Sequence, residues 1–294
     1  MKPSLEHLDQ LFSNSREAAR RLRSGPPVRV AFVACSYDTA FEPPADQVEE
    51  KIHQLQEAFG IDEGVEWSLW VVDDLPAEIG FTHAVEVGFS RVDPRLRQAA
   101  RLRCLPMHSE VPRPGGLKGR ALLDGMGAAL EADPVVVVYL NLNLKVDALL
   151  SAVGIEAVSA DRADVAVGSR ARGDGGLAVG AGALGRVKSR VYSRIARTAL
   201  PPLAQYVDTN APVKVFSAAA AAHLVAHARL DDVTLDCEWL LLSQTAGFRM
   251  CRFPIAWIQR AGSRPPWHLI ALSLRDMWRL RRRWIAGELP RRGE

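Results

Sequence analysis

The stretch Val28-Arg-Val-Ala-Phe-Val-Ala-Cys35 decides the fold class, because it is an almost unbroken run of apolar, strand-forming residues. A strand with one solvent-exposed face alternates between apolar and polar side chains, whereas a strand of a parallel sheet that is buried on both faces is apolar throughout. Further strand-like runs occur at residues 65–72, 135–140 and 163–167. We predict that these four segments are strands of one parallel sheet.

Helical segments separate these strands. Leucine residues on one stripe predict an N-terminal helix over residues 4–22. Later helices are predicted at residues 45–59, 118–131, 186–200, 217–227 and 235–244, and further extended segments at 102–107, 207–216 and 248–258. A glycine-rich loop is expected at residues 173–185. Strands that alternate with helices form right-handed βαβ crossovers, which predicts an α/β fold with a mostly parallel central sheet.

The predicted organisation is one domain with a tail. No internal repeat or long linker is visible, and 294 residues suffice for one large α/β core. We place a single domain at residues 1–265, beginning with an N-terminal helix (1–24). A basic amphipathic tail follows at residues 266–294.

Composition and charge exclude several classes of protein. Hydrophobic residues make up 48% of the chain and charged residues 24%, which is ordinary for a soluble protein, and a formal charge of +3 predicts no nucleic-acid partner. The four cysteines form no CxxC pair, which favours reduced thiols in the cytoplasm. Residues 1–25 lack the apolar core of a signal peptide, and the longest apolar run, residues 134–144, is too short to span a bilayer. We expect a cytoplasmic protein, with peripheral contact at the inner face of the membrane as an alternative.

Polar side chains collect where the predicted strands end. In open α/β sheets, ligands bind in the crevice beyond the carboxyl ends of the strands. Polar residues at four such ends therefore predict a nucleotide-type site, although strand ends are polar in most α/β proteins. The residues concerned are Ser36, Tyr37, Asp73, Asp74, Asn141, Asn143, Ser169 and Arg170.

Seven short motifs stand in an order that resembles the family 2 glycosyltransferases, and in particular their dolichyl-phosphate sugar synthase branch. The resemblance covers roughly residues 28–264 and depends on motif order as much as on identity. The motifs are Val-Val-Asp73-Asp74, Gly116-Leu-Lys118-Gly119-Arg-Ala121 with Gly125, Tyr139-Leu-Asn141-Leu-Asn143-Leu, Gly168-Ser169-Arg170, Asp208-Thr-Asn-Ala-Pro-Val-Lys214-Val-Phe216, Leu235-Asp236-Cys-Glu238, and Phe253-Pro-Ile-Ala-Trp257 followed by Gly262-Ser263-Arg264.

The resemblance implies a single Rossmann-like, GT-A-type domain that transfers a sugar from a nucleoside-diphosphate sugar to a phosphate or hydroxyl acceptor, with inversion. It favours polyprenyl phosphate as the acceptor. Such a transfer must hold the nucleoside diphosphate, stabilise its developing charge and guide the acceptor oxygen. The nucleotide sugar would be bound by Ser36, Tyr37, Asp73, Asp74, Lys118, Asn141, Asn143 and Lys214.

Individual roles follow from the residue types. Asp73 or Asp74 would accept hydrogen bonds from the base and the ribose; the alternative is that these aspartates cap the next turn. Lys118 would lie beside the nucleotide at a helix N-terminus, unless it is simply an exposed lysine of the first turn.

The central departure from the family pattern is that Asn141 and Asn143 replace the two aspartates of its metal-binding DxD motif. Amide oxygens can ligate Mg²⁺ or Mn²⁺, but they lack the charge of a carboxylate. Removing one unit charge about 4 Å from a cation costs about 4 kcal/mol at an effective dielectric constant of about 20. A divalent cation is therefore expected to bind orders of magnitude more weakly. The protein then works without a metal, uses cations elsewhere or no longer transfers sugar.

Two acids and a basic helix are the remaining candidates for chemistry. Asp236 and Glu238 open a predicted helix, where one of them could act as general base or order the acceptor; the alternative is an acid favoured by the helix dipole. The acceptor phosphate would be bound by Arg170, Arg190 and Ser193, on and beside a helix whose four arginines share one face. A solvated arginine face is the alternative.

Two other motifs are weaker. Gly180-Ala-Gly-Ala-Leu-Gly185 spells GxGxxG, but the strand before it is poor and no acidic residue follows at the usual distance. A mobile active-site loop is favoured over a dinucleotide site. His223 and His227 lie four residues apart without a neighbouring glutamate, which favours a structural pair over a metal site.

The tail carries an apolar stripe of Ile270, Leu274, Met277 and Trp278, which arginines flank. This composition suits a helix lying on an anionic membrane surface. The alternative is that the stripe docks on the domain or on a second subunit.

Two hypotheses from different classes remain. The first is an active glycosyltransferase. The second is a catalytically silent relative that binds a nucleotide sugar or a partner protein, and its motivation is the Asn141/Asn143 pair. A sugar-nucleotide pyrophosphorylase has a similar sheet, but it needs a glycine-rich loop after the first strand, which residues 34–38 lack.

Overall fold

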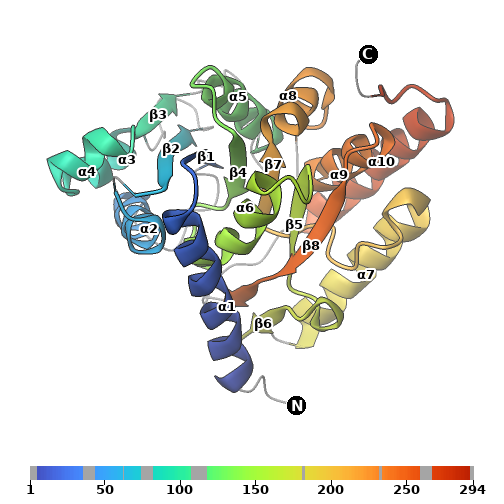
Figure 1. Cartoon of the computed structure of the whole chain (residues 1–294). Coiled ribbons are helices and arrows are strands. Elements are labelled where there is room, and N and C mark those ends of the chain that lie inside the picture. The colour runs from blue at the N-terminus through green and yellow to red at the C-terminus, as the bar shows by residue number, and fades with distance from the viewer. Residues whose placement is uncertain are drawn as a thin grey trace.

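The computed structural model describes residues 5–35, 44–61, 63–73, 82–106, 118–180, 183–231, 234–258 and 267–291. A seven-stranded sheet forms its centre, in the order β3-β2-β1-β4-β7-β5-β8 (Figure 1). Its strands are β1 (Val28–Cys35), β2 (Val65–Asp73), β3 (Arg103–Pro106), β4 (Val136–Leu140), β5 (Val165–Ser169), β7 (Val213–Ser217) and β8 (Met250–Pro254).

The predicted mostly parallel sheet is confirmed. β7 alone among these seven strands runs in the opposite direction, because it pairs antiparallel with both β4 and β5. β4 is buried at every position, which explains its unbroken apolar sequence. The reversed direction of β7 was not predicted, since a local sequence pattern carries no information about the direction of a strand relative to its neighbours.

Helices cover both faces of the sheet (Figure 1). The helices are α1 (Leu5–Ser24), α2 (Pro44–Phe59), α3 (Thr82–Ser90), α4 (Pro94–Ala99), α5 (Lys118–Leu130), α6 (Ala152–Ser159), α7 (Ala183–Ala199), α8 (Ala218–His227), α9 (Leu235–Thr245) and α10 (Trp267–Ile285). α1, α2 and α6 contribute to the apolar core on one face, and α5, α8 and α9 to the core on the other. All predicted helices are confirmed, whereas α3, α4 and α6 were missed because they are short.

A second, two-stranded sheet corrects two predictions. β6 (Leu177–Val179) pairs in parallel with β9 (Ala256–Ile258), so the segment predicted as a glycine-rich loop contains a strand. The single strand predicted at residues 248–258 is divided between β8 and β9. Ile255 separates them: its N–H donates to the carbonyl of Ser169 at 2.9 Å, while its own carbonyl accepts from Leu177 N–H at 2.9 Å.

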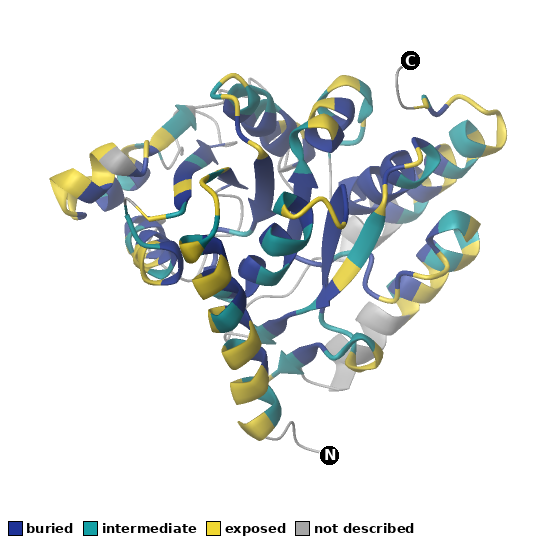
Figure 2. Cartoon of the chain, viewed as in Figure 1, coloured by how far each residue is buried: buried dark blue, intermediate teal, exposed yellow. Residues whose placement is uncertain are grey.

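The C-terminal helix α10 packs on the domain. Met277 and Leu280 are almost fully buried in the same core as α9, and Leu274 packs against that core, whereas Trp278 is 67% exposed. Most of the described stripe thus supports the docking alternative. Figure 2 shows the buried strands at the centre and the exposed outer sides of the helices. No helix within the described ranges is long and apolar enough to cross a bilayer.

Candidate functional site

The pairing register brings the predicted site residues to one edge of the sheet. Cys35 of β1 lies opposite Val72 of β2, and Tyr139 of β4 and Val167 of β5 both lie opposite Lys214 of β7. Because β1, β2, β4 and β5 run in the same direction, their carboxyl ends meet at this edge, which we call the carboxyl edge.

Asp73, Asn141 and Arg170 stand in line along the carboxyl edge, at the ends of β2, β4 and β5. One strand separates each from the next, which corresponds to about 10 Å per step at the usual strand spacing. The predicted alignment of these three positions is therefore present. Ser36, Tyr37 and Asp74, which were predicted to complete the edge, lie outside the described residues.

Asp73 is buried with 2% of its surface exposed, and its Oδ2 accepts a hydrogen bond from the Thr82 hydroxyl at 2.8 Å. Thr82 opens α3, so the aspartate ties the strand end to the next helix. This contact agrees with the capping alternative. The predicted binding of base or ribose by Asp73 stays a prediction.

Asn141 is held by the residues around it. Its backbone N–H donates to the carbonyl of Pro212 at 3.2 Å, and its side-chain Oδ1 accepts from the Tyr139 hydroxyl at 2.8 Å. The Tyr139 ring is fixed in turn, because Trp239 of α9 packs edge-on against it with ring centroids 5.7 Å apart. The amide of Asn141 is therefore oriented by a rigid aromatic side chain.

A buried ion pair lies beneath Asn141. The Lys214 ammonium is fully buried, donates to Asp236 and to the carbonyl of Ala211, and lies 5.5 Å from the centre of the Tyr139 ring. Asp236 is 3% exposed. The Asp236 carboxylate is thus engaged by an ammonium of its own chain, which favours a positioning role over the predicted role as general base. For Lys214, this position favours support of the edge over direct contact with a diphosphate.

Glu238 is engaged by three donors of its own chain. Its Oε2 accepts from the backbone N–H groups of Arg229 and Leu230 at 2.9 and 2.8 Å, and its Oε1 accepts from Arg283 of α10 at 2.7 Å. The side chain is fully buried. These contacts favour a structural role, which joins α10 to the turn before α9, over the predicted catalytic one.

Arg170 binds Asp208 through both its guanidinium group and its backbone N–H. Its Nε and Nη2 donate to the two carboxylate oxygens at 2.8 and 2.7 Å, and its backbone N–H donates to Oδ2 at 2.8 Å. Burial alone would raise the pKa of Asp208, but the charge and hydrogen bonds of Arg170 outweigh it and lower that pKa. The guanidinium also lies 5.8 Å from the Trp257 ring centre. The guanidinium and backbone N–H of Arg170 thus link the end of β5 to β9 and to the segment before β7.

The loop after β4, residues 141–147, is supported from α2 by a residue that the sequence did not reveal. Lys51 is fully buried, and its ammonium donates to the carbonyl of Val146 at 2.8 Å and to Gln54 at 3.0 Å. Within the loop, the Oδ1 of Asn143 accepts from the backbone N–H of Lys145 at 3.4 Å. A lysine in an amphipathic helix is normally exposed, so no sequence signal distinguished Lys51.

Three of the predicted site residues lie on helices, as expected. Lys118 and Arg190 are the first residue of α5 and a residue of α7, but the placement of their side chains is outside the described part of the chain. Ser193 is buried on α7 with 7% exposed. Gly119, from the second motif, lies where a Cβ would come within 2.4 Å of the carbonyl of Leu230, so a glycine is required there.

No protein-family model and no curated protein matches the sequence. Solved structures of glucosyl-3-phosphoglycerate synthase from Mycobacterium tuberculosis are similar in fold. Its complex with phosphoglyceric acid has a TM-score of 0.55 at 16% identity, over 92% of this chain and 82% of that chain. Its complex with Mn²⁺, UDP-glucose and glycerol 3-phosphate has a TM-score of 0.56 at 15% identity, over the same shares.

The chain has a GT-A-type fold. At this level of identity the similarity establishes the fold alone. Other structures of the same synthase contain Mn²⁺ together with UDP or UDP-glucose. Whether the carboxyl edge of this chain fits a divalent cation is therefore decided by its own residues.

The described donor set at the GT-A carboxyl edge does not fit such a cation. The oxygens of Asn141 and Asn143 carry no net charge, and each already uses one lone pair to accept from Tyr139 or from the backbone of Lys145. The carboxylates of Asp208 and Asp236 are paired with Arg170 and Lys214. In the described ranges, no three His, Cys, Asp or Glu residues gather as a metal site would require.

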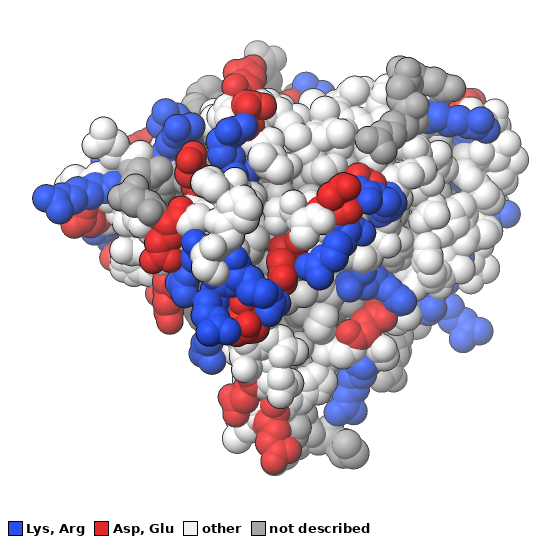
Figure 3. Space-filling model, in the orientation of Figure 1, with Lys and Arg blue, Asp and Glu red and all other residues white. Residues whose placement is uncertain are grey.

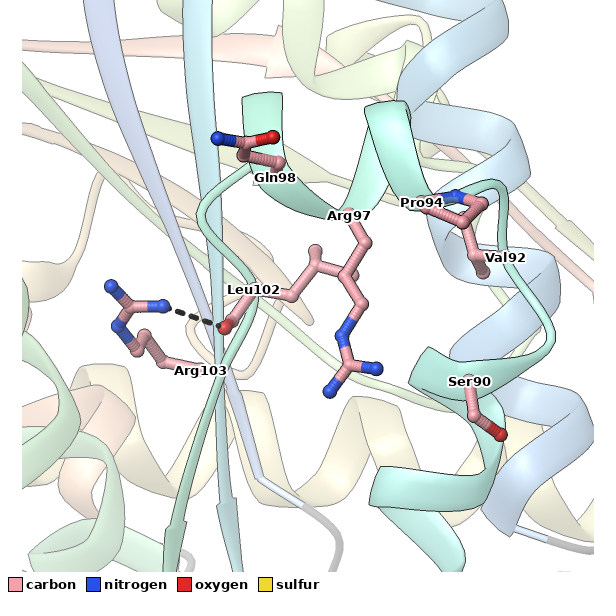
Figure 4. A pocket seen from close by; sticks show the side chains of 7 residues that line it. All are labelled: Ser90, Val92, Pro94, Arg97, Gln98, Leu102 and Arg103. Carbon is pink, nitrogen blue, oxygen red and sulfur yellow. Dashed lines mark hydrogen bonds between the residues drawn. The ribbon is translucent and has the colours of Figure 1, made fainter.

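Two hollows in the described surface lie away from the carboxyl edge. One of about 360 Å³ is at the start of β3, where Arg103 donates to the carbonyl of Leu102 at 3.2 Å (Figure 4). The other, of about 520 Å³, is lined by the first residues of β1 and β2, including Arg29 and Glu66. Both are at the amino ends of strands, where an α/β sheet does not usually bind its ligand.

The thiols of Cys104 and Cys237 and the histidine pair do not form reactive sites. Burial raises the pKa of Cys237 to about 11 and that of Cys104 to about 12, so both thiols stay protonated at neutral pH. The rings of His223 and His227 lie 4.5 Å apart, and burial together with His227 lowers the pKa of His223. This arrangement agrees with a structural pair.

The surface over α1 and α6 carries both signs of charge side by side (Figure 3). Arg21 contacts Glu17 at 3.1 Å and Glu156 at 2.8 Å, and Arg162 approaches Glu156 at 3.4 Å. Such exposed pairs contribute little to stability, and this face concentrates neither sign.

Proposed function

We propose that this protein is a glycosyltransferase that moves a sugar from a nucleoside-diphosphate sugar to a phosphate-bearing acceptor, with inversion. The observation that carries the proposal is the alignment of Asp73, Asn141 and Arg170 at the carboxyl edge of a GT-A-type sheet. Further support comes from structures of similar fold, which hold UDP-glucose together with phosphoglyceric acid.

The donor would lie across the ends of β2, β1 and β4. Asp73 would face the base and ribose, and the diphosphate would lie toward Asn141 and the first turn of α5, which begins at Lys118. The N-terminus of a helix favours anions, because its free N–H groups and dipole are positive.

The acceptor would attack from the side of Arg170 and α7. In a single displacement, the acceptor oxygen bonds to the anomeric carbon while the nucleoside diphosphate leaves, which inverts the configuration at that carbon. An ionised phosphate oxygen needs no base, and this agrees with an Asp236 whose charge is neutralised by Lys214. The chain's contribution is then positioning and charge stabilisation.

The acceptor distinguishes two versions of the proposal. The sequence resemblance favours polyprenyl phosphate, whereas the structures of similar fold contain phosphoglyceric acid. Both carry a phosphate. Because α10 docks its apolar residues on the domain, we favour a small water-soluble phosphate acid, and the lipid phosphate is the competing acceptor.

A thermal-shift screen with UDP- and GDP-sugars tests the donor site. We expect at least one nucleotide sugar to raise the melting temperature, by mass action on the folded state. Sugar transfer is then measured with 3-phosphoglycerate and with a short polyprenyl phosphate as acceptors. If no nucleotide sugar raises the melting temperature, the proposed donor site is wrong.

A silent relative that binds a nucleotide sugar or a partner is the second candidate. The observation in its favour is that the charged groups of Arg170, Lys214, Asp236 and Glu238 are all engaged within the protein. A nucleotide sugar that protects the protein, without transfer to any acceptor or to water, would support this candidate.

A further inference from the structure

We infer that the carboxyl edge binds the nucleoside diphosphate of the donor directly, with no divalent cation between the protein and the phosphates. The inference rests on the proposed function, because it specifies how the donor site of that function works. Four observations carry it: the orientation of Asn141, the contact of Asn143, the pairing of carboxylates at the edge and the rigidity of the support.

The orientation of Asn141 matters because a cation and an anion need opposite atoms of its amide. The Oδ1 of Asn141 accepts from the Tyr139 hydroxyl at 2.8 Å, which uses one of its two lone pairs, whereas Nδ2 presents two N–H donors. An N–H donor repels a metal ion and binds an anionic oxygen. The residue is only partly buried, so a ligand can reach it.

Asn143 offers a cation no better ligand. Its Oδ1 faces the backbone N–H of Lys145 at 3.4 Å, and the residue is 9% exposed. Both amide oxygens that would replace the two carboxylates of a DxD motif are thus directed at donors of this chain.

Two carboxylates at the described part of the edge are each paired with a cation of the chain. Asp208 is neutralised by Arg170 and Asp236 by Lys214, each at bonding distance. A divalent cation would therefore add two positive charges without two carboxylates to offset them, which is unfavourable at a partly buried site. A diphosphate, in contrast, would meet the amide N–H groups of Asn141 and the N-terminal end of α5.

The support of Asn141 is a rigidly held aromatic side chain. The Tyr139 ring is fully buried, with Trp239 against its edge and the Lys214 ammonium 5.5 Å from its centre. The hydroxyl oxygen is consequently fixed in place, and in this arrangement its O–H donates to Oδ1 of Asn141.

The first experiment measures Mn²⁺ binding to the full chain by calorimetry, without nucleotide. We expect no detectable binding by the wild type. Asn141→Asp/Asn143→Asp restores two carboxylates and should bind Mn²⁺ at least about 100-fold more tightly. Asn14→Asp adds one negative charge at an exposed position of α1; it is the matched control for the single variant Asn143→Asp and should gain nothing. Asn143→Asp alone serves if the double variant is unfolded by circular dichroism.

The second experiment measures UDP and GDP affinity in excess EDTA and in excess Mn²⁺. We expect the same wild-type affinity in both, and stronger binding in Mn²⁺ for the double variant. A wild-type affinity that falls about tenfold or more in EDTA overturns the inference but leaves the proposed function intact. Wild-type calorimetry that shows micromolar Mn²⁺ binding also overturns it. If neither nucleotide binds in either buffer, the proposed function itself fails.

Discussion

The pair formed by Arg170 and Asp208 shows how a residue of a ligand-binding motif can be engaged within the protein. Arg170 follows a strand at a ligand-binding edge, which predicts contact with an acceptor phosphate. In the structure, two of its side-chain nitrogens and its backbone N–H bind Asp208, and Nη2 also reaches the carbonyl of Asn210 at 2.9 Å. Any contact of Arg170 with an acceptor would have to be made alongside these bonds.

Asp208→Asn tests the energy of this pair. Removing one member of a buried ion pair leaves the other uncompensated, so we expect the free energy of unfolding to fall by about 3 kcal/mol at neutral pH. The pKa of Asp208 is lower in the folded than in the unfolded protein. Its contribution is therefore complete above the unfolded pKa of about 4 and is lost as the pH falls through the lower, folded pKa.

Urea unfolding of wild type and Asp208→Asn across acidic pH measures this difference directly. The two stabilities should differ by a constant amount above about pH 5 and converge below about pH 4. A difference that persists unchanged into strong acid would show that the lost stability does not come from the carboxylate charge.

Gly176 is a second residue with a testable constraint. A Cβ at this position would lie 2.0 Å from the carbonyl oxygen of Ser169, which precedes Arg170. Since backbone must move to admit it, Gly176→Ala should destabilise the protein by about 1–3 kcal/mol. Gly173→Ala in the same loop is the matched control, because nothing lies within 4 Å of its added Cβ. Equal melting temperatures for the two variants would contradict the close approach.

At the scale of elements, α2 supports the loop that carries Asn141 and Asn143. Lys51 bonds the carbonyl of Val146, and the Gln54 oxygen accepts from the backbone of Ala148 at 3.2 Å. On its other side, the loop is joined to β9, because Ile258 N–H donates to the carbonyl of Lys145 at 2.8 Å. Two elements distant in sequence, α2 and β9, thereby fix one short loop.

Lys51→Met tests the support from α2. Loss of a charged hydrogen bond to a buried carbonyl should lower the free energy of unfolding by about 1–3 kcal/mol, and it should weaken nucleotide binding if the loop forms the donor site. Chemical denaturation and calorimetry measure the two effects. Arg20→Met is the control: it removes an exposed pair with Glu17 and should cost less than about 0.5 kcal/mol.

The success of element prediction depended on length and burial. β1 was predicted with its observed bounds, and α5 and α9 nearly so, because long periodic or apolar runs leave one interpretation. β6 was missed, since three residues between glycines carry no period. Its strand character comes from pairing with β9, some eighty residues later in the chain.

At the scale of the whole molecule, α10 completes the core on the α9 face of the sheet. Arg283 reaches Glu238, Arg281 donates to the carbonyl of Ala199 at the end of α7, and Met277 is 1% exposed. The basic, amphipathic tail is therefore part of the folded domain in this region, and its arginines serve partly as links between helices.

Met277→Ala and Trp278→Ala test which side of α10 packs on the domain. Truncating the buried methionine should cost about 2–5 kcal/mol, whereas truncating the neighbouring tryptophan, which is 67% exposed, should change stability by less than about 0.5 kcal/mol. Thermal and urea unfolding of both variants provide the measurement. A larger loss from Trp278→Ala would mean that this side of α10 is covered in solution.

The sequence by itself determined the class of fold, the order of most strands and helices, and the edge at which polar residues gather. Those features follow from local patterns. The period of the apolar residues determines whether a segment is a helix or a strand, and the end of each strand determines where the polar residues after it lie. Only the tertiary structure decided what each polar group does there. Whether Arg170, Lys214, Asp236 and Glu238 face a ligand or one another depends on strands paired across long sequence separations and on the reversed β7, and no local pattern encodes those contacts.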